Sequence, residues 1–142
     1  LSEIAALTVR NTNSDVRVAI KALYYLALEP SIDVRAVFEL ARRDLVQDVL
    51  TDLADSNLLI LRAIADSREP FVKAVYETYR RISGAVGGEP FSYVHFYASL
   101  SYLQSTGLIL LVSTKVGRAY TNQLQLLFDR ELLQATCGAR FG

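Results

Sequence analysis

The chain has 142 residues and no net charge, because 15 Lys and Arg side chains balance 15 Asp and Glu side chains. Its apolar content of 51% is enough to form a hydrophobic core, which excludes a disordered chain and fits one domain or two small ones. Any binding to nucleic acid must therefore come from local clusters of positive charge.

The sequence predicts an intracellular protein that does not contact a membrane. Its one cysteine, Cys137, cannot form a disulfide or a cysteine-rich zinc site within the chain and fits a reducing compartment. The longest apolar stretch, residues 16–28, is interrupted by Arg17 and Lys21 and is shorter than the roughly 20 residues that cross a bilayer. The first residues do not resemble a signal peptide.

The chain begins with Leu1 and contains no methionine, although average usage would give about three in this length. We therefore expect a fragment of a longer polypeptide, with methionines or whole segments left out of the sequence.

Two helices are predicted in the first third of the chain, with a boundary near residues 51–56 that separates a segment 1–50 from a segment 51–142. Residues 13–15 offer capping oxygens to a helix that Pro30 ends, and its expected inner face consists of Val16, Ala19, Ile20, Leu23, Leu26 and Ala27. A second helix follows Ser31 or Asp33, and charges of mixed sign predict a solvated outer face. Its inner face is formed by Val34, Val37, Phe38, Ala41, Leu45 and Val49.

A third helix is predicted over residues 58–66 and is apolar on nearly all sides, so we expect it at the centre of the core. Pro70 is expected in the first turn of a fourth helix, where its missing N–H costs nothing. The apolar stripe of that helix includes Tyr76 and Tyr79, which are expected to be core residues, and the glycines of residues 84–89 end it.

A fifth helix is predicted over residues 92–106. Ser92 caps it, and Gly107 takes the left-handed conformation after its end. Its expected inner face consists of Tyr93, Phe96, Tyr97, Leu100 and Leu103, and its expected outer face of His95, Ser99 and Tyr102. Residues 108–112 and 119–128 are predicted as the strands of a hairpin with a basic turn at 113–118, and residues 129–136 as a closing helix.

Helices followed by a hairpin with a basic tip are typical of the winged helix, so the predicted fold class is mainly α with a small β-hairpin. In that fold the third helix enters the major groove of DNA, and the hairpin places a cation near phosphates or in the minor groove. The predicted DNA-binding residues are Ser92, His95, Ser99, Lys115 and Arg118. An exposed histidine without a special role is an equally good interpretation of His95, and solvated helix ends are the simpler interpretation of Arg80 and Arg81.

The sequence contains no signature of an enzyme. It lacks the phosphate loop G-x-x-x-x-G-K-[ST], the G-x-G-x-x-G and H-E-x-x-H motifs, and a Ser/His/Asp arrangement. We therefore expect no catalytic residue, no metal site and no cofactor in this chain.

Three stretches resemble the origin recognition complex and cell-division-control (ORC/CDC) family of replication initiators, which are AAA+ ATPases. The first is NSDVRVAIKAL at residues 13–23, similar to a helix of the ATPase lid. The second is VYETYRRI at residues 75–82 with Glu89, Pro90 and Ser92. The third is LSYLQSTGLI at residues 100–109, together with the Gly117-Arg118 pair at the wing. The sequence departs from the family at Val94 and His95, where relatives often carry basic residues.

The resemblance implies a helical segment from the end of an AAA+ lid over residues 1–50 and a winged-helix domain over 51–142. Arg17 would be the sensor arginine that reaches nucleotide phosphates, with Asp15 capping its helix. The complete protein would bind ATP or ADP with Mg²⁺, and its partners would be duplex origin DNA, other initiator subunits and the replicative helicase. Its place would be the archaeal cytoplasm and nucleoid or the eukaryotic nucleus.

Two other functions fit the same residues. A winged helix whose Val94, Ala98 and Tyr102 surface packs on another subunit would be a protein-interaction module of a larger complex. A winged-helix transcription regulator would form a symmetric dimer on a palindromic site.

Overall fold

A computed structural model describes residues 3–4, 16–28 and 33–142 of the chain. The chain divides into two compact units, Leu1–Val49 and Leu50–Gly142. The expected cap at residues 13–15 and the expected helix stop at Pro30 lie outside the described residues.

In the first unit, helix α2 (Val16–Leu28) packs against helix α3 (Val34–Asp52). The buried residues of this core are Ile4, Val18, Ala22, Val37, Phe38 and Ala41. Polar contacts also join the helices: Lys21 Nζ lies 3.1 Å from Asp48 Oδ2, and the Tyr25 hydroxyl donates to the carboxylate of Asp44.

The predicted inner face of α3 is confirmed at Val37, Phe38 and Ala41. That of α2 is confirmed only at the partly buried Ala19 and Leu26. Val16 and Ile20 are 64% and 60% exposed, and the buried side chains are those of Val18 and Ala22. Because α2 is apolar on nearly every side, its residue spacing does not fix which side faces α3.

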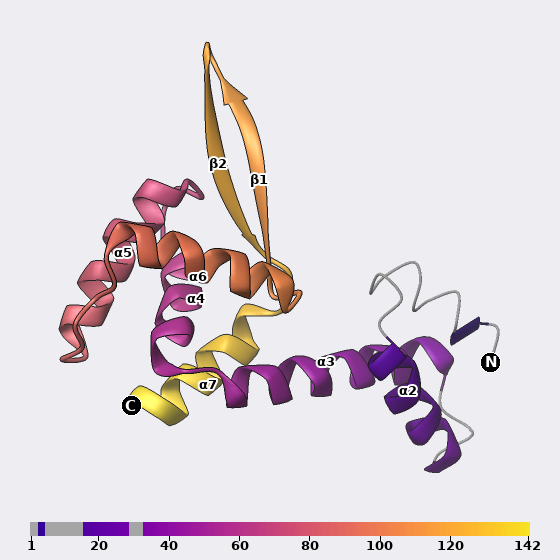
Figure 1. Cartoon of the computed structure of the whole chain (residues 1–142). Helices are drawn as coiled ribbons and strands as arrows, with labels where there is room; N and C mark the ends of the chain where they lie inside the picture. The colour runs from indigo at the N-terminus through magenta and orange to yellow at the C-terminus, as the bar shows by residue number, and fades with distance from the viewer. Residues whose placement is uncertain (1–2, 5–15, 29–32) are drawn as a thin grey trace. The chain divides into compact units, whose positions relative to one another are not determined.

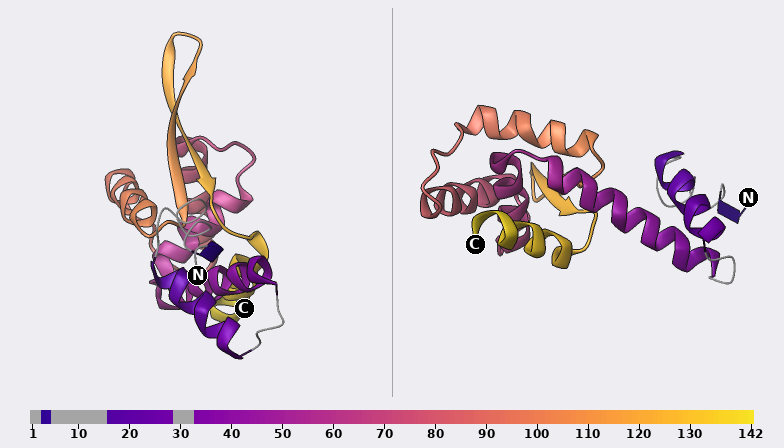
Figure 2. Two further views of the ribbon diagram at one scale, coloured as in Figure 1. Left: turned by 90° about the vertical axis from the view of Figure 1, so that its right-hand side faces the viewer. Right: turned by 90° about the horizontal axis from the view of Figure 1, so that it is seen from below.

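Helix α4 (Asp55–Asp66) is the centre of the second unit, as the sequence predicts. It contacts α5 (Val72–Ala85), α6 (Tyr93–Ser105), α7 (Arg130–Phe141) and strand β2 (Ala119–Leu126). Its buried residues are Leu58, Leu59, Ile60, Leu61, Ala63 and Ile64. Helices α6 and α7 lie on opposite sides of the unit (Figure 2, right), so the surface of α6 is separate from that of α7.

Strand β1 (Ile109–Val116) pairs with β2 in one antiparallel hairpin, from Ile109 opposite Leu126 to Val116 opposite Ala119. The predicted turn at 113–118 is too long, because residues 113–116 continue the strand pairing and only Gly117 and Arg118 make the turn. Gly117 has a φ of 64°, which suits the tight two-residue turns of hairpins.

Pro70 is not in the first turn of α5, contrary to the prediction. Its carbonyl accepts a 2.7 Å hydrogen bond from the Leu124 N–H, and Phe71 forms a β-bridge with Gln123 and caps α5. The segment before α5 therefore adds a short third edge to the hairpin, which ties the base of β2 to the helices.

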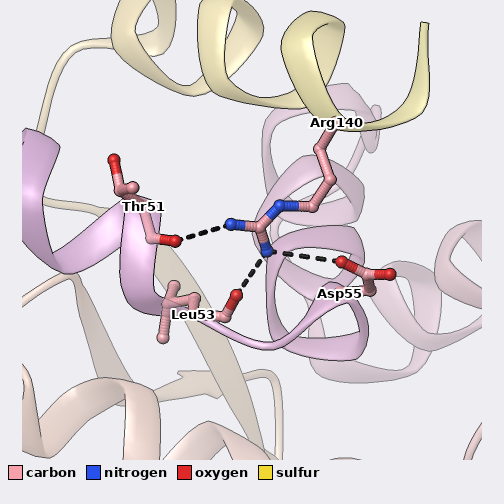
Figure 3. A network of polar contacts seen from close by, with 4 residues as sticks. All are labelled: Thr51, Leu53, Asp55 and Arg140. Atoms are coloured by element: carbon pink, nitrogen blue, oxygen red, sulfur yellow. Dashed lines mark hydrogen bonds and ion pairs between the residues drawn. The ribbon is translucent and has the colours of Figure 1, made fainter.

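Helix α7 continues to Phe141, five residues past its predicted end at Thr136. Near its end, Arg140 Nη2 donates to the Thr51 carbonyl at 2.7 Å (Figure 3). Its Nη1 donates to the Leu53 carbonyl and lies 3.4 Å from Asp55 Oδ1. One guanidinium thus binds one carbonyl oxygen in the last turn of α3 and one just after it, where a helix leaves such oxygens without internal partners.

The observed fold class is the predicted one, mainly α-helical with a two-stranded antiparallel sheet. None of the helices that the structure describes has both the length and the hydropathy to span a membrane.

Candidate nucleic-acid interface

Two tyrosines of α5 fix the point at which α6 begins. The Tyr79 hydroxyl accepts a 3.0 Å hydrogen bond from the Phe91 N–H, and the Tyr76 hydroxyl donates to the Phe91 carbonyl at 2.9 Å. Tyr79 is buried, and this burial raises the pKa of its hydroxyl above the ordinary value. Both tyrosines are packed as predicted, and they also hold the backbone of the residue before the α6 cap.

Ser92 caps α6 as predicted, since its Oγ accepts a 3.3 Å hydrogen bond from the His95 N–H. The exposed His95 ring stacks on Phe91, with ring centroids 3.8 Å apart and an angle of 17° between the planes. The Ser99 hydroxyl donates to the His95 carbonyl at 3.0 Å. The structure therefore brings Ser92, His95 and Ser99 together, each already in a contact within α6 or its cap.

His95 and Ser99 line one side of a shallow groove of about 410 Å³. The other side is the start of α4, and the lining comprises Ala54, Ser56, Asn57, Phe91, His95, Ala98, Ser99 and Tyr102. These two predicted DNA-binding residues thus lie on the flank of α6 that faces α4.

The outermost line of α6 consists of Val94, Ala98, Ser101 and Ser105, all exposed. At 100° per residue these four point away from the buried Phe96, Leu100 and Leu103. Val94 is 79% exposed. Sequence reasoning placed His95 and Ser99 at the centre of this surface, although the same helical arithmetic places Val94 and Ala98 there.

Tyr93 was predicted to face inward, but it is 40% exposed. Its ring packs edge-on against Tyr76, with centroids 5.2 Å apart. Tyr93 lies in the first turn of α6, where only part of its side chain is covered. The predicted inner positions Phe96, Leu100 and Leu103 are confirmed as core residues.

The hairpin is fastened to the other flank of α6 by two hydrogen bonds. Asn122 Nδ2 donates to the Tyr97 hydroxyl at 2.8 Å, and the Leu111 N–H donates to Gln104 Oε1 at 2.7 Å. Beyond these contacts β1 and β2 project away from the helices of the unit (Figures 1 and 2).

The end of the hairpin carries the predicted cations. Lys115 and Arg118 are both exposed, and Lys115 pairs across the strands with Tyr120, which is 74% exposed. Because side chains alternate along a strand, Tyr120 shares a face of the hairpin with Asn122, the residue bound to α6. Sequence reasoning missed Tyr120, although its alternation with Asn122 was available as a signal.

Arg17, the predicted sensor, is an exposed residue of α2 in the first unit. In the second unit burial raises the pKa of the Cys137 thiol, which disfavours the reactive thiolate. The described residues include no cluster of His, Cys, Asp and Glu that could hold a metal ion.

No family model and no curated protein matches the sequence. A solved structure of the Aeropyrum pernix ORC1 protein in complex with DNA is similar to this chain, with a TM-score of 0.74 at 22% sequence identity. The match covers 99% of this chain and 40% of that chain, so the chain spans less than half the length of that protein. The structure of Cdc6p from Pyrobaculum aerophilum matches at a TM-score of 0.49 and 19% identity, covering 91% of this chain and 38% of that one. The chain therefore has the mainly helical, hairpin-bearing fold of part of an ORC1 protein.

Proposed function

We propose that the second unit is a winged helix that binds duplex DNA, in a replication initiator of the ORC/CDC family. The observation that carries this proposal is the exposed α6 beside a projecting hairpin that ends in Lys115 and Arg118. The resemblance of three sequence stretches to that family and the fold shared with an ORC1 protein support it.

In this proposal α6 enters the major groove, and the hairpin reaches the adjacent backbone or minor groove. Lys115 and Arg118 supply the charge that α6 itself lacks, since residues 93–105 include no Lys or Arg. Tyr120 adds an aromatic contact beside Lys115. Because phosphate contacts dominate affinity and the chain has no net charge, binding is weak, and it falls as the salt concentration rises.

For the first unit we propose the role of the end of an AAA+ lid in the complete initiator. Arg17 is the proposed sensor for the phosphates of ATP or ADP bound with Mg²⁺. Other initiator subunits and the replicative helicase are the proposed partners.

Fluorescence anisotropy with the full chain and a labelled duplex tests the DNA-binding proposal over 20 to 200 mM salt. Lys115→Gln and Arg118→Gln should each weaken binding by roughly 1 kcal/mol and reduce the slope of log affinity against log salt by about one. The matched control is Arg62→Gln, because Arg62 lies beside α7 residues in a groove away from α6. Unchanged slopes in both hairpin variants would reject the proposed role of the wing.

The uncharged α6 favours one second candidate, a protein-interaction module. Val94, Tyr102 and Ala98 form an exposed and largely apolar surface without a cation. Such a module would show negligible affinity for DNA even at 20 mM salt, so the same titration separates the two functions.

A further inference from the structure

The outermost line of α6 has an unusual chemistry for a helix that meets DNA bases. Its four residues are Val94, Ala98, Ser101 and Ser105. None of them is ionised or carries an amide, and the Ser105 hydroxyl already donates to the Tyr102 carbonyl at 2.6 Å. The first two turns of this line therefore offer only aliphatic carbon to a partner.

Base edges in the major groove differ in the side chains that recognise them. Guanine is read by the paired donors of Arg or Lys, adenine by the amide of Asn or Gln, and cytosine by an acceptor carboxylate. Thymine alone presents a methyl group, which apolar side chains contact. Of these groups, only the thymine C5-methyl suits Val94 and Ala98.

We propose that Val94 and Ala98 read thymine C5-methyl groups, so that the DNA segment met by the first two turns of α6 is rich in A·T pairs. This inference rests on the proposed DNA-binding function and names the bases that the same site selects. Val94 is the main specificity residue, because at 79% exposure it is the most exposed large apolar residue of α6.

The charges beside this surface favour DNA over a protein as its occupant. The hairpin is fastened to α6 through Asn122 and Tyr97, and its end carries Lys115 and Arg118 without an acidic residue between positions 108 and 128. An apolar helix surface next to a hairpin whose only charges are positive complements base methyls beside a phosphate backbone.

The test compares two 24-base-pair duplexes of A·T pairs with G·C ends that differ only in uracil for thymine. Uracil removes the methyl group and keeps the charge and the base pairing, and an A·T repeat requires no knowledge of the natural target. The full chain should bind the thymine duplex roughly four-fold more tightly for one buried methyl and up to about fifteen-fold for two.

Val94→Ser should remove most of this preference, and Ala98→Ser should reduce it in part. Both residues are exposed, so folding can be verified from an unchanged thermal melt. Lys115→Gln is the matched control, because it should weaken binding to both duplexes and leave their ratio unchanged.

Three results would overturn the inference. Salt-dependent binding with equal affinity for the two duplexes would support DNA binding and show that α6 does not recognise thymine methyl groups. A preference that survives in Val94→Ser and Ala98→Ser would assign it to the shape of the DNA. Absence of binding to either duplex at 20 mM salt would reject the proposed function together with this inference.

Discussion

Two hydrogen bonds fix the point at which α6 begins, because Phe91 is held at both its N–H and its carbonyl by tyrosine hydroxyls. The Phe91 ring in turn supports the His95 imidazole. Substitution of either tyrosine by phenylalanine would keep the packing and remove one of these bonds. These two hydroxyl oxygens of α5 therefore hold the residue that precedes the α6 cap.

Tyr79→Phe should lower the free energy of unfolding by about 1 to 2 kcal/mol, since the Phe91 N–H loses its partner. Burial raises the pKa of Tyr79 above its ordinary value of 10.0 in the folded chain. The stability that the hydroxyl contributes is therefore complete below pH 10 and is lost as the pH rises through the folded pKa. Urea unfolding should show the full difference from wild type at pH 8 and a smaller one above pH 10. Tyr102→Phe, at an exposed position, is the control and should change neither value.

For single residues, the sequence predicts which side chains of a helix are buried, because helical spacing determines this. It does not predict contacts with residues outside the helix. Phe96, Leu100 and Leu103 follow from spacing, and so does the cap by Ser92. The exposure of Tyr93 and the stacking of His95 on Phe91 depend on how far the preceding loop covers the first turn, which spacing does not specify.

Among the elements, those with a clear polar side or a distinctive turn residue were predictable. Helices α3, α5 and α6 and the pairing of the hairpin follow from the sequence. The orientation of α2 does not, because its apolar residues surround the helix. The end of α7 is also not predictable, because Arg140 there binds carbonyl groups 89 and 87 residues earlier in the chain. Pro70 is compatible with the first turn of a helix, but in the structure its carbonyl accepts a hydrogen bond from Leu124 of β2.

Arg140→Ala should destabilise the second unit by about 1 to 3 kcal/mol, because a half-buried guanidinium that donates to two backbone carbonyls is lost. Thermal unfolding followed by circular dichroism measures the change. Arg140→Lys should recover only part of the stability, since one ammonium lacks the fork that reaches both carbonyls. Arg130, in contrast, is exposed and donates to a single carbonyl of α4. Arg130→Ala should therefore reduce the free energy of unfolding by less. An Arg140→Ala variant as stable as wild type would show that the contact does not hold the end of α7.

On the scale of the whole molecule, the chain consists of two units with separate proposed tasks. Arg17 belongs to the first, and the proposed DNA contacts belong to the second. Loss of nucleotide turnover and loss of DNA binding should therefore result from different substitutions.

If the complete protein is the proposed ATP-binding initiator, Arg17→Ala should lower its ATP turnover by on the order of ten-fold, the expected effect of losing one charged hydrogen bond to a phosphate. Arg43→Ala, at another exposed arginine of the first unit, is the matched control. The affinity for duplex DNA in the absence of nucleotide should stay unchanged in both. Equal turnover in the Arg17 and Arg43 variants would contradict the sensor role.

The length of the hairpin has a consequence for the geometry of a complex with DNA. Beyond the contact of Leu111 with α6, residues 112–116 of β1 rise about 3.4 Å each and extend roughly 17 Å, which matches about five base steps of B-DNA. In the proposed complex, one molecule inserts α6 at one place and reaches this far to one side. The stretch of DNA that it protects is therefore asymmetric. The bound molecule then has a direction along the duplex, without any need for a two-fold symmetric target.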